Sequence, residues 1–320
     1  MTEEIPNSEV RVREFLTSFY EKMEAPLIEG RTLAFYVDEI QPYSQPHKPK
    51  RQDIILSMVI DEYLGFMIAC HARLAETLGR NQDQGAVCAL TQLSMIMNDI
   101  AAIRLLTSRG FDLAARRQSR SLYETVNTFI LSSHDEEFRK AFLASTTFEA
   151  SNKFWHTYIA KEKDLRRIKD RFPEQFGNPE FLNDVMVEER KILGMTVHPS
   201  MLLGLALLKR EVNRFSLSGD RDTQYSSEKV LQFTMFQCWN AVTFGLGHLG
   251  LKPVPLFEAM LQDTEASPGS VVWRSLPAWR KALMMLCPVI AVRITDMRRE
   301  AATRSKASDE KAASEREGDH

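Results

Sequence analysis

The chain has 320 residues, 44% of them hydrophobic and 26% charged, a composition typical of globular proteins and not of disordered ones. Its 41 basic and 43 acidic residues give a net charge of -2, which excludes a general electrostatic attraction to nucleic acid or to an anionic membrane. The four cysteines are far apart and lack the paired spacing of zinc or redox sites, so we expect reduced core residues.

The N-terminal segment, residues 1–40, contains one amphipathic pattern. Apolar residues recur every three or four positions from Ser8 to about Ala25, which predicts a helix capped by Ser8. This acidic N-terminus does not resemble a secretory signal, so we expect a cytoplasmic protein. Three prolines between Gln41 and Arg51 disfavour helix and predict a linker at residues 41–51.

A helical domain is predicted at residues 52–300. Its first part contains long apolar patterns interrupted by short glycine-containing breaks, which indicate antiparallel neighbouring helices. Asp135 is positioned to cap a further, highly charged helix that extends to about Arg171. The three long helices before it are expected at about Gln52 to Leu78, Gly85 to Thr107 and Leu113 to Ser132.

The second part of this domain is also expected to be helical. Pro288 is predicted to kink the last helix. Residues 301–320 have no apolar residue larger than alanine, which predicts a disordered or loosely helical tail. The fold class is therefore all-α, a bundle of about nine to ten helices in one body. The remaining helices are expected at about Glu180 to Leu193, Ser200 to Arg214, Ser226 to Gly247, Pro255 to Leu261 and Pro277 to Arg299.

Two long segments, residues 192–208 and 232–251, contain no charged residue. Prolines, glycines and polar amides interrupt both of them, and such groups are costly when they face lipid. We therefore interpret the segments as interior helices and expect no membrane partner.

Polar residues form one face of the segment from Met97 to Ile130. Arg120 and Glu124 are spaced for a helical ion pair, and two readings of this face remain open. In one, Arg116, Arg117 and Arg120 form a guanidinium cluster that binds phosphate or carboxylate. In the other, these arginines have only a structural role, as partners in ion pairs within the chain. Asn98 and Asp99 are expected to meet this face across the helical hairpin.

His198 lies between two apolar segments and precedes Pro199, which favours extended backbone at the histidine. A histidine in this position is either a general acid or base near neutral pH or a core residue with both ring nitrogens hydrogen-bonded. Paired carboxylate ligands, a His-Glu-x-x-His motif and phosphate loops are not found, so no metal or nucleotide cofactor is predicted.

The pattern formed by these residues resembles an uncharacterised group of bacterial helical proteins that is itself remotely similar to HEPN domains. The residues that carry the resemblance are Asn98-Asp99, Arg104-Leu105-Leu106, Gly110, Arg120-Ser121-Leu122, Glu124 and His198-Pro199. HEPN proteins include ribonucleases of toxin and antiphage systems, whose usual motif is an arginine followed on the same helix by a histidine after four to six residues. No histidine of this chain has an arginine at that spacing.

The resemblance implies an accessory or effector protein of a bacterial stress or antiphage system, with RNA as a partner. If it is an enzyme, we expect a metal-independent ribonuclease. Its catalytic residues would be Arg120, Glu124 and His198, brought together from different helices. Asn98, Asp99, Arg116 and Arg117 would support them.

Two other functions remain open. One is a non-enzymatic scaffold that binds a protein partner or another copy of itself, for which exposure of Met95, Met97, Met284, Met285 and Trp273 or Trp279 is the discriminating feature. The other is a helical bundle that holds a small anionic ligand at the arginine cluster.

Overall fold

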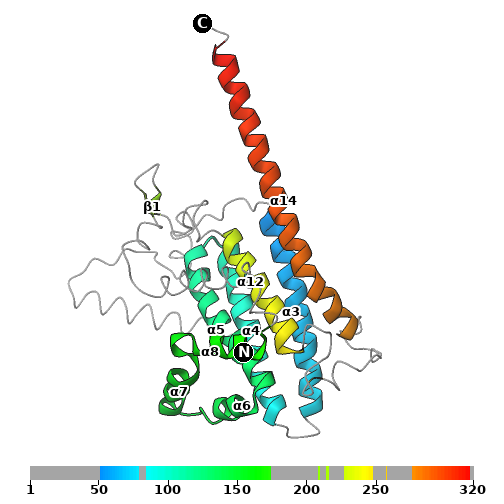
Figure 1. Ribbon diagram of the computed structural model, residues 1–320, viewed down its shortest axis with the longest axis vertical. Coiled ribbons are helices and arrows are strands. Elements are labelled where there is room, and N and C mark those ends of the chain that lie inside the picture. The colour runs from blue at the N-terminus through cyan, green and yellow to red at the C-terminus, as the bar shows by residue number, and fades with distance from the viewer. Residues whose placement is uncertain are drawn as a thin grey trace, which may run out of the picture. The chain divides into compact units, whose positions relative to one another are not determined.

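The computed structural model describes residues 51–78, 84–173, 208–209, 214–215, 227–247, 257 and 276–317. The chain divides into two compact units, residues 1–45 and 46–320, and every described residue belongs to the second; Figure 1 shows the helices of this unit. The helix predicted from Ser8 to about Ala25 lies outside the described residues.

Three long helices form the centre of this unit: α3 (Arg51–Leu78), α4 (Gln84–Ser108) and α5 (Asp112–His134). They confirm the helices predicted from the apolar patterns. The α4–α5 turn closes with hydrogen bonds from Phe111 N–H to the Leu106 carbonyl (2.9 Å) and from Gly110 N–H to the Thr107 carbonyl (3.1 Å), which form a Schellman motif. Gly110 has a φ of 79°, a conformation that suits glycine because it has no Cβ.

Helix α12 (Ser227–Asn240) and the π-helical turn that follows it (Ala241–Gly245) pack against α3 and α5. They confirm the helix predicted at this position. Most of the side chains of α12 are buried, including the polar Thr234, Gln237 and Asn240. A helix that is apolar or buried on most sides belongs to the interior, and α12 lies among the other helices in Figure 1.

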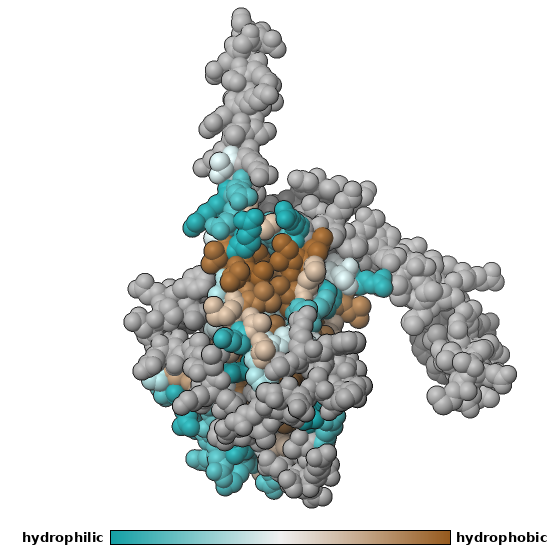
Figure 2. Space-filling model, turned by 90° about the vertical axis from the view of Figure 1, so that its right-hand side faces the viewer, coloured by the Kyte–Doolittle hydropathy of each residue, from teal (hydrophilic) through white to brown (hydrophobic). Residues whose placement is uncertain are grey.

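Helix α14 (Leu276–Glu317) runs antiparallel to α3. The Tyr63 hydroxyl donates a hydrogen bond to the Leu283 carbonyl (2.7 Å), and the ring of Phe66 packs edge-on against Trp279 at 5.5 Å. On the side of the molecule where α14 lies, Figure 2 shows an apolar surface patch. The helix contains Pro288; the kink predicted there stays a prediction.

The segment from Asp135 to Arg171 is not one helix, so this prediction is wrong. Asp135 does cap α6 (Glu136–Leu143), by accepting a hydrogen bond from Phe138 N–H at 3.0 Å. A second cap, Thr147, then starts α7 (Phe148–Phe154). A π-helical turn (Trp155–Ile159) and a 3₁₀ turn (Ala160–Glu162) precede α8 (Lys163–Arg171). Lys161 and Glu162 have positive φ angles of 58° and 64°, which separate the turn from α8.

The C-terminal half differs from the prediction in one place. Leu208–Lys209 (β1) and Arg214–Phe215 (β2) form a short antiparallel pair where a helix was predicted, because periodicity cannot distinguish a short apolar helix from extended chain. Helix α14 continues to Glu317 through the segment expected to be disordered or loosely helical; this segment is rich in alanine, lysine, arginine and glutamate, which are good helix formers.

The described residues are almost entirely helical, which confirms the all-α class. They do not establish the expected nine to ten helices. The helix predicted from Glu180 to Leu193 lies outside them, and of the one from Pro255 to Leu261 only Phe257 is described.

Two helices of the described part are long and apolar enough to cross a membrane, namely the stretches Arg51–Glu76 and Gln84–Ser108. About half of each window is buried inside the protein, 44% and 50% respectively. Core helices of soluble proteins have the same properties, so these two stretches are a weak indication of a membrane protein.

Candidate functional site

Arg120 and Glu124 form the ion pair that their spacing on α5 predicts. The Arg120 Nε and Nη2 atoms both lie 2.5 Å from Glu124 Oε1. Their side chains are 22% and 28% exposed, so the pair is partly accessible to solvent. His198 lies outside the described residues, and its convergence with this pair stays a prediction.

Asp99 meets α5 across the hairpin, as predicted. Its Oδ1 accepts a hydrogen bond of 2.6 Å from Gln118 Nε2. Burial raises the pKa of Asp99, and hydrogen bonds from Ser121 and Gln118 oppose that shift. Asn98, in contrast, is exposed. Asp99 therefore serves the packing of α4 on α5.

The three arginines of the predicted cluster occupy different environments. Arg116 is completely buried, with its guanidinium 5.4 Å from the ring centroid of Phe233. Arg117 is exposed, and Arg120 is partly buried in its pair with Glu124. Arg116 and Arg117 point in different directions from α5, so the three side chains do not form one common guanidinium surface.

The four methionines named in the sequence analysis also differ in their exposure to solvent. Met284 is buried, and Met97 is partly buried against the core. Met95 and Met285 are 45% and 63% exposed. Trp279 is partly buried and packs on Phe66, while Trp273 lies outside the described residues.

A pocket of about 360 Å³ opens between the ends of four helices. It lies where α3, α5 and α12 begin and where α4 ends. Ile54, Met58 and Leu231 provide apolar lining. The polar lining consists mainly of Asp53, Ser57, Asp61, Arg104, Asp112 and Ser227.

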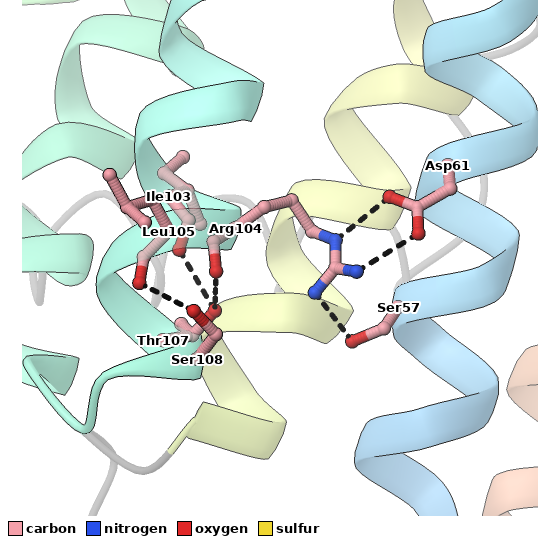
Figure 3. A network of polar contacts seen from close by, with 7 residues as sticks. All are labelled: Ser57, Asp61, Ile103, Arg104, Leu105, Thr107 and Ser108. Carbon is pink, nitrogen blue, oxygen red and sulfur yellow. Dashed lines mark hydrogen bonds and ion pairs between the residues drawn. The ribbon is translucent and has the colours of Figure 1, made fainter. Parts of the chain in front are cut away.

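Arg104 connects two helices across one wall of this pocket (Figure 3). Its Nε and Nη2 atoms each donate a hydrogen bond of 2.9 Å to the two carboxylate oxygens of Asp61, and Nη1 donates to the Ser57 hydroxyl at 2.9 Å. A two-point contact of this kind fixes the orientation of both side chains. The charges of Arg104 and Asp61 therefore compensate each other.

Asp112 is the buried acid of the pocket, with an exposed fraction of 3%. Burial raises the pKa of Asp112 to about 7. The backbone N–H of Ser227, at the start of α12, donates a hydrogen bond that lowers the pKa, and the charge of Asp53 raises it. The Oδ1 atom of Asp112 is buried and accepts no hydrogen bond within the described residues.

The local sequence explains why these groups meet. The Gly110 turn brings the end of α4 and the start of α5 together, so Arg104 and Asp112 line the same pocket. Asp53 belongs to the first turn of α3, and the N-terminal N–H groups of helices favour nearby carboxylates.

Sequence reasoning did not identify this site. Arg104 and Gly110 carried the family resemblance, but no pocket was inferred from them. One signal was present, because Asp61 and Arg104 are opposite charges in the apolar stretches of two helices predicted to be neighbours. Nothing in the sequence marked Asp112, which looks like an ordinary acidic residue at a helix start.

Comparison with known proteins gives no relative for this site. No family model, no curated protein and no solved structure matches the chain. Within the described residues, no three histidine, cysteine or acidic side chains are grouped so that they could hold a metal ion. The chemistry of the pocket itself is therefore the basis for a functional proposal.

Proposed function

We propose that the helical unit binds a small organic cation, an ammonium or amidinium group on an apolar body, in the pocket between α3, α4, α5 and α12. Asp112 carries this proposal. It is a buried carboxyl group that lines the pocket and has an oxygen atom that accepts no hydrogen bond within the described residues. A buried polar atom of this kind is costly unless a partner satisfies it.

The charges that line the pocket favour a cation. They are the carboxylates Asp53, Asp61 and Asp112 and one guanidinium, Arg104, which is bound to Asp61; α12 contributes no charged side chain to the lining. The starts of three helices add partial positive charge. Burial and the charge of Asp53 raise the pKa of Asp112, and the hydrogen bond from the Ser227 N–H at the start of α12 does not offset them.

The shape and the lining favour an organic cation over a metal ion. Ile54, Met58 and Leu231 would contact an apolar body, and ligand pockets typically combine apolar walls with a few polar groups that fix orientation. An ammonium or amidinium group donates several hydrogen bonds, which fits the oxygen atoms of Asp112 and of the serine hydroxyl groups.

Benzamidine and benzamide are a suitable pair of probes, since they share the aromatic body and differ in charge. We expect calorimetry or ligand-observed NMR to detect benzamidine binding to the full chain at pH 8, with benzamide at least about tenfold weaker, because a buried carboxylate discriminates strongly by charge. Equal binding of both probes, or binding of neither, would contradict the proposal.

Two variants locate the binding. Asp112→Asn keeps an oxygen acceptor for the Ser227 N–H but removes the charge, and we expect at least about a tenfold loss of benzamidine affinity. Glu136→Gln on α6 removes an exposed acid outside the pocket lining and is expected to leave the affinity unchanged. An equal loss in both variants would point to nonspecific attraction.

The effector function implied by the HEPN resemblance is a second candidate, and one surface favours it. Trp155 is 41% exposed, its ring is next to that of His156, and Lys163, the first residue of α8, donates a hydrogen bond of 2.7 Å to the His156 carbonyl. Exposed aromatic rings beside basic side chains are typical of single-stranded nucleic-acid contacts. The positive φ angles of Lys161 and Glu162 in the same region are a conformation often found at functional sites.

The ribonuclease proposal is tested by incubating total RNA with the wild type, Arg120→Ala and His198→Ala, and by following both cleavage and thermal melting. Loss of cleavage in both variants at unchanged melting temperature would support a catalytic set assembled across helices. Absence of cleavage by the wild type would leave Arg120 as a structural residue.

A further inference from the structure

Helix α14 carries an exposed apolar surface, which is independent of the proposed pocket. No charged residue occurs from Ala282 to Val292, so this part of the helix is apolar on all sides. One face, with Leu283, Met284 and Cys287, is buried against the body of the unit. The opposite face remains apolar although it is exposed.

Three large side chains make up this exposed face, which we call the α14 stripe. Met285, Val289 and Val292 are 63%, 59% and 62% exposed, and they follow one another at intervals of four and three residues. This spacing places them in a single row along the helix. They belong to α14, which lies on the side of the molecule where Figure 2 shows an apolar patch.

Single exposed apolar residues are common on protein surfaces, but a continuous row of them commonly marks an interface. The spacing also indicates the partner, because the stripe is complementary to itself. Met285 and Val292 are equally far from a point between Pro288 and Val289. If two copies of α14 pack antiparallel about that point, Met285 of each copy faces Val292 of the other.

Two of the charged residues that flank the stripe have the same symmetry. Lys281 and Asp296 are also equally far from this midpoint, and their spacing from Met285 and Val292 puts them on the same side of the helix. Within the described residues neither side chain has an ion-pair partner in its own chain. In the antiparallel pair, Lys281 of each copy meets Asp296 of the other.

We propose that two copies of this chain associate through their α14 stripes, antiparallel about a two-fold axis that passes between Pro288 and Val289. Such an interface is isologous, since the same surface is used twice and each contact occurs twice. The apolar contacts at its centre are flanked at both ends by pairs of opposite charges.

The size of the stripe sets the expected strength of association. A standard stable interface buries about 800 Å² per partner, which three side chains do not provide alone. A reversible dimer with a dissociation constant in roughly the micromolar range is therefore expected. Sedimentation velocity over a series of concentrations would show a shift from monomer to dimer.

Val289→Asp places a charge at the centre of the stripe and is expected to keep the chain monomeric over the whole series. Leu105→Asp is the matched control, because Leu105 is 61% exposed on α4 and is expected to leave the dimer intact. Both positions are exposed, so neither variant should change the thermal melting of the monomer. Equal effects of the two variants on association would overturn the proposal.

Charge reversal tests the register. Lys281→Glu and Asp296→Lys are each expected to weaken the dimer, since each places like charges opposite one another. The double variant Lys281→Glu/Asp296→Lys is expected to recover wild-type association. If the double variant dimerises no better than either single variant, the antiparallel register is wrong.

A cross-linking experiment tests the same register by distance. Met285→Cys and Val292→Cys are expected to form a disulfide with each other when the two variants are mixed and oxidised. Met285→Cys alone should not, because its two copies would be offset by seven residues, about 10 Å along the axis, beyond the reach of a disulfide. The four native cysteines are buried and should not interfere.

Two results would count against a second copy of the chain as the partner. A wild type that stays monomeric at all concentrations overturns the proposal. If such a monomer also floats with vesicles of phosphatidylglycerol and phosphatidylethanolamine, and Val289→Asp abolishes flotation, the stripe binds a membrane surface instead.

Discussion

Replacing Asp112 with asparagine tests the electrostatics of the pocket through the pH dependence of stability. Burial raises the pKa of Asp112 to about 7 in the folded protein, whereas an aspartate in an unfolded chain has a pKa near 4. Between about pH 4 and pH 7 the unfolded chain loses this proton while the folded protein keeps it. The free energy of unfolding of the wild type therefore decreases through this range as the pH rises.

The size of the effect follows from the two pKa values. Each pKa unit corresponds to about 1.4 kcal/mol, so the wild type would lose on the order of 4 kcal/mol by pH 8 relative to pH 4 through this group. Because the site relaxes when the Asp112 carboxyl group ionises, we expect a loss of about 2 to 4 kcal/mol.

Asparagine never ionises, so the variant lacks this loss. Urea unfolding followed by circular dichroism at pH 4.5 and pH 8 would show Asp112→Asn gaining about 2 to 4 kcal/mol relative to the wild type between the two pH values. A change in packing that the amide causes alters the free energy of unfolding equally at the two pH values. It therefore cancels when the two values are compared. A constant difference between the two proteins, or a relative loss for the variant at pH 8, would refute the argument.

Three further predictions concern single contacts. Arg104→Met leaves the partly exposed Asp61 without its guanidinium partner, and urea unfolding is expected to show a loss of less than about 1 kcal/mol of stability. Because the pocket becomes more negative, calorimetry is expected to show that benzamidine binds several-fold more tightly. Gly245→Ala would place a Cβ against two ring carbons of the buried Phe129, closer than van der Waals contact allows, so a loss of about 1 to 3 kcal/mol is expected in urea unfolding. Arg120→Ala removes a pair on the partly exposed surface of α5 and is expected to cost less than about 1 kcal/mol; a larger loss in urea unfolding would make the pair a part of the core.

The long helices were predictable because local and global preferences agree in them. In α3, α4 and α5 the apolar rows and the glycine of the α4–α5 turn all point to the observed elements. The segment after Asp135 was not predictable in the same way. Its break before α8 depends on two left-handed residues, Lys161 and Glu162, each disfavoured by about 1 to 2 kcal/mol. Tertiary packing must offset this conformational cost, and helix propensities do not predict where it does so.

The pocket was not predictable for a related reason. It is built from the ends of four helices, and the sequence indicates helices better than it indicates which ends meet. The Arg120–Glu124 pair could be predicted because both residues belong to one helix. The contact of Asp112 with Ser227 joins α5 to α12 across more than a hundred residues, and only that packing makes the acid a buried one.

Stability and ligand binding should respond to pH in opposite directions at this site. Above pH 7 the ionised Asp112 destabilises the folded protein, but it is then a stronger partner for a cation. A ligand that binds only the folded state raises the free energy of unfolding by an amount that grows with its affinity. Benzamidine should therefore raise the melting temperature more at pH 8 than at pH 6 in the wild type, and equally little at both in Asp112→Asn. A pocket that binds the probe through its apolar walls alone would give the same increase at both pH values in both proteins.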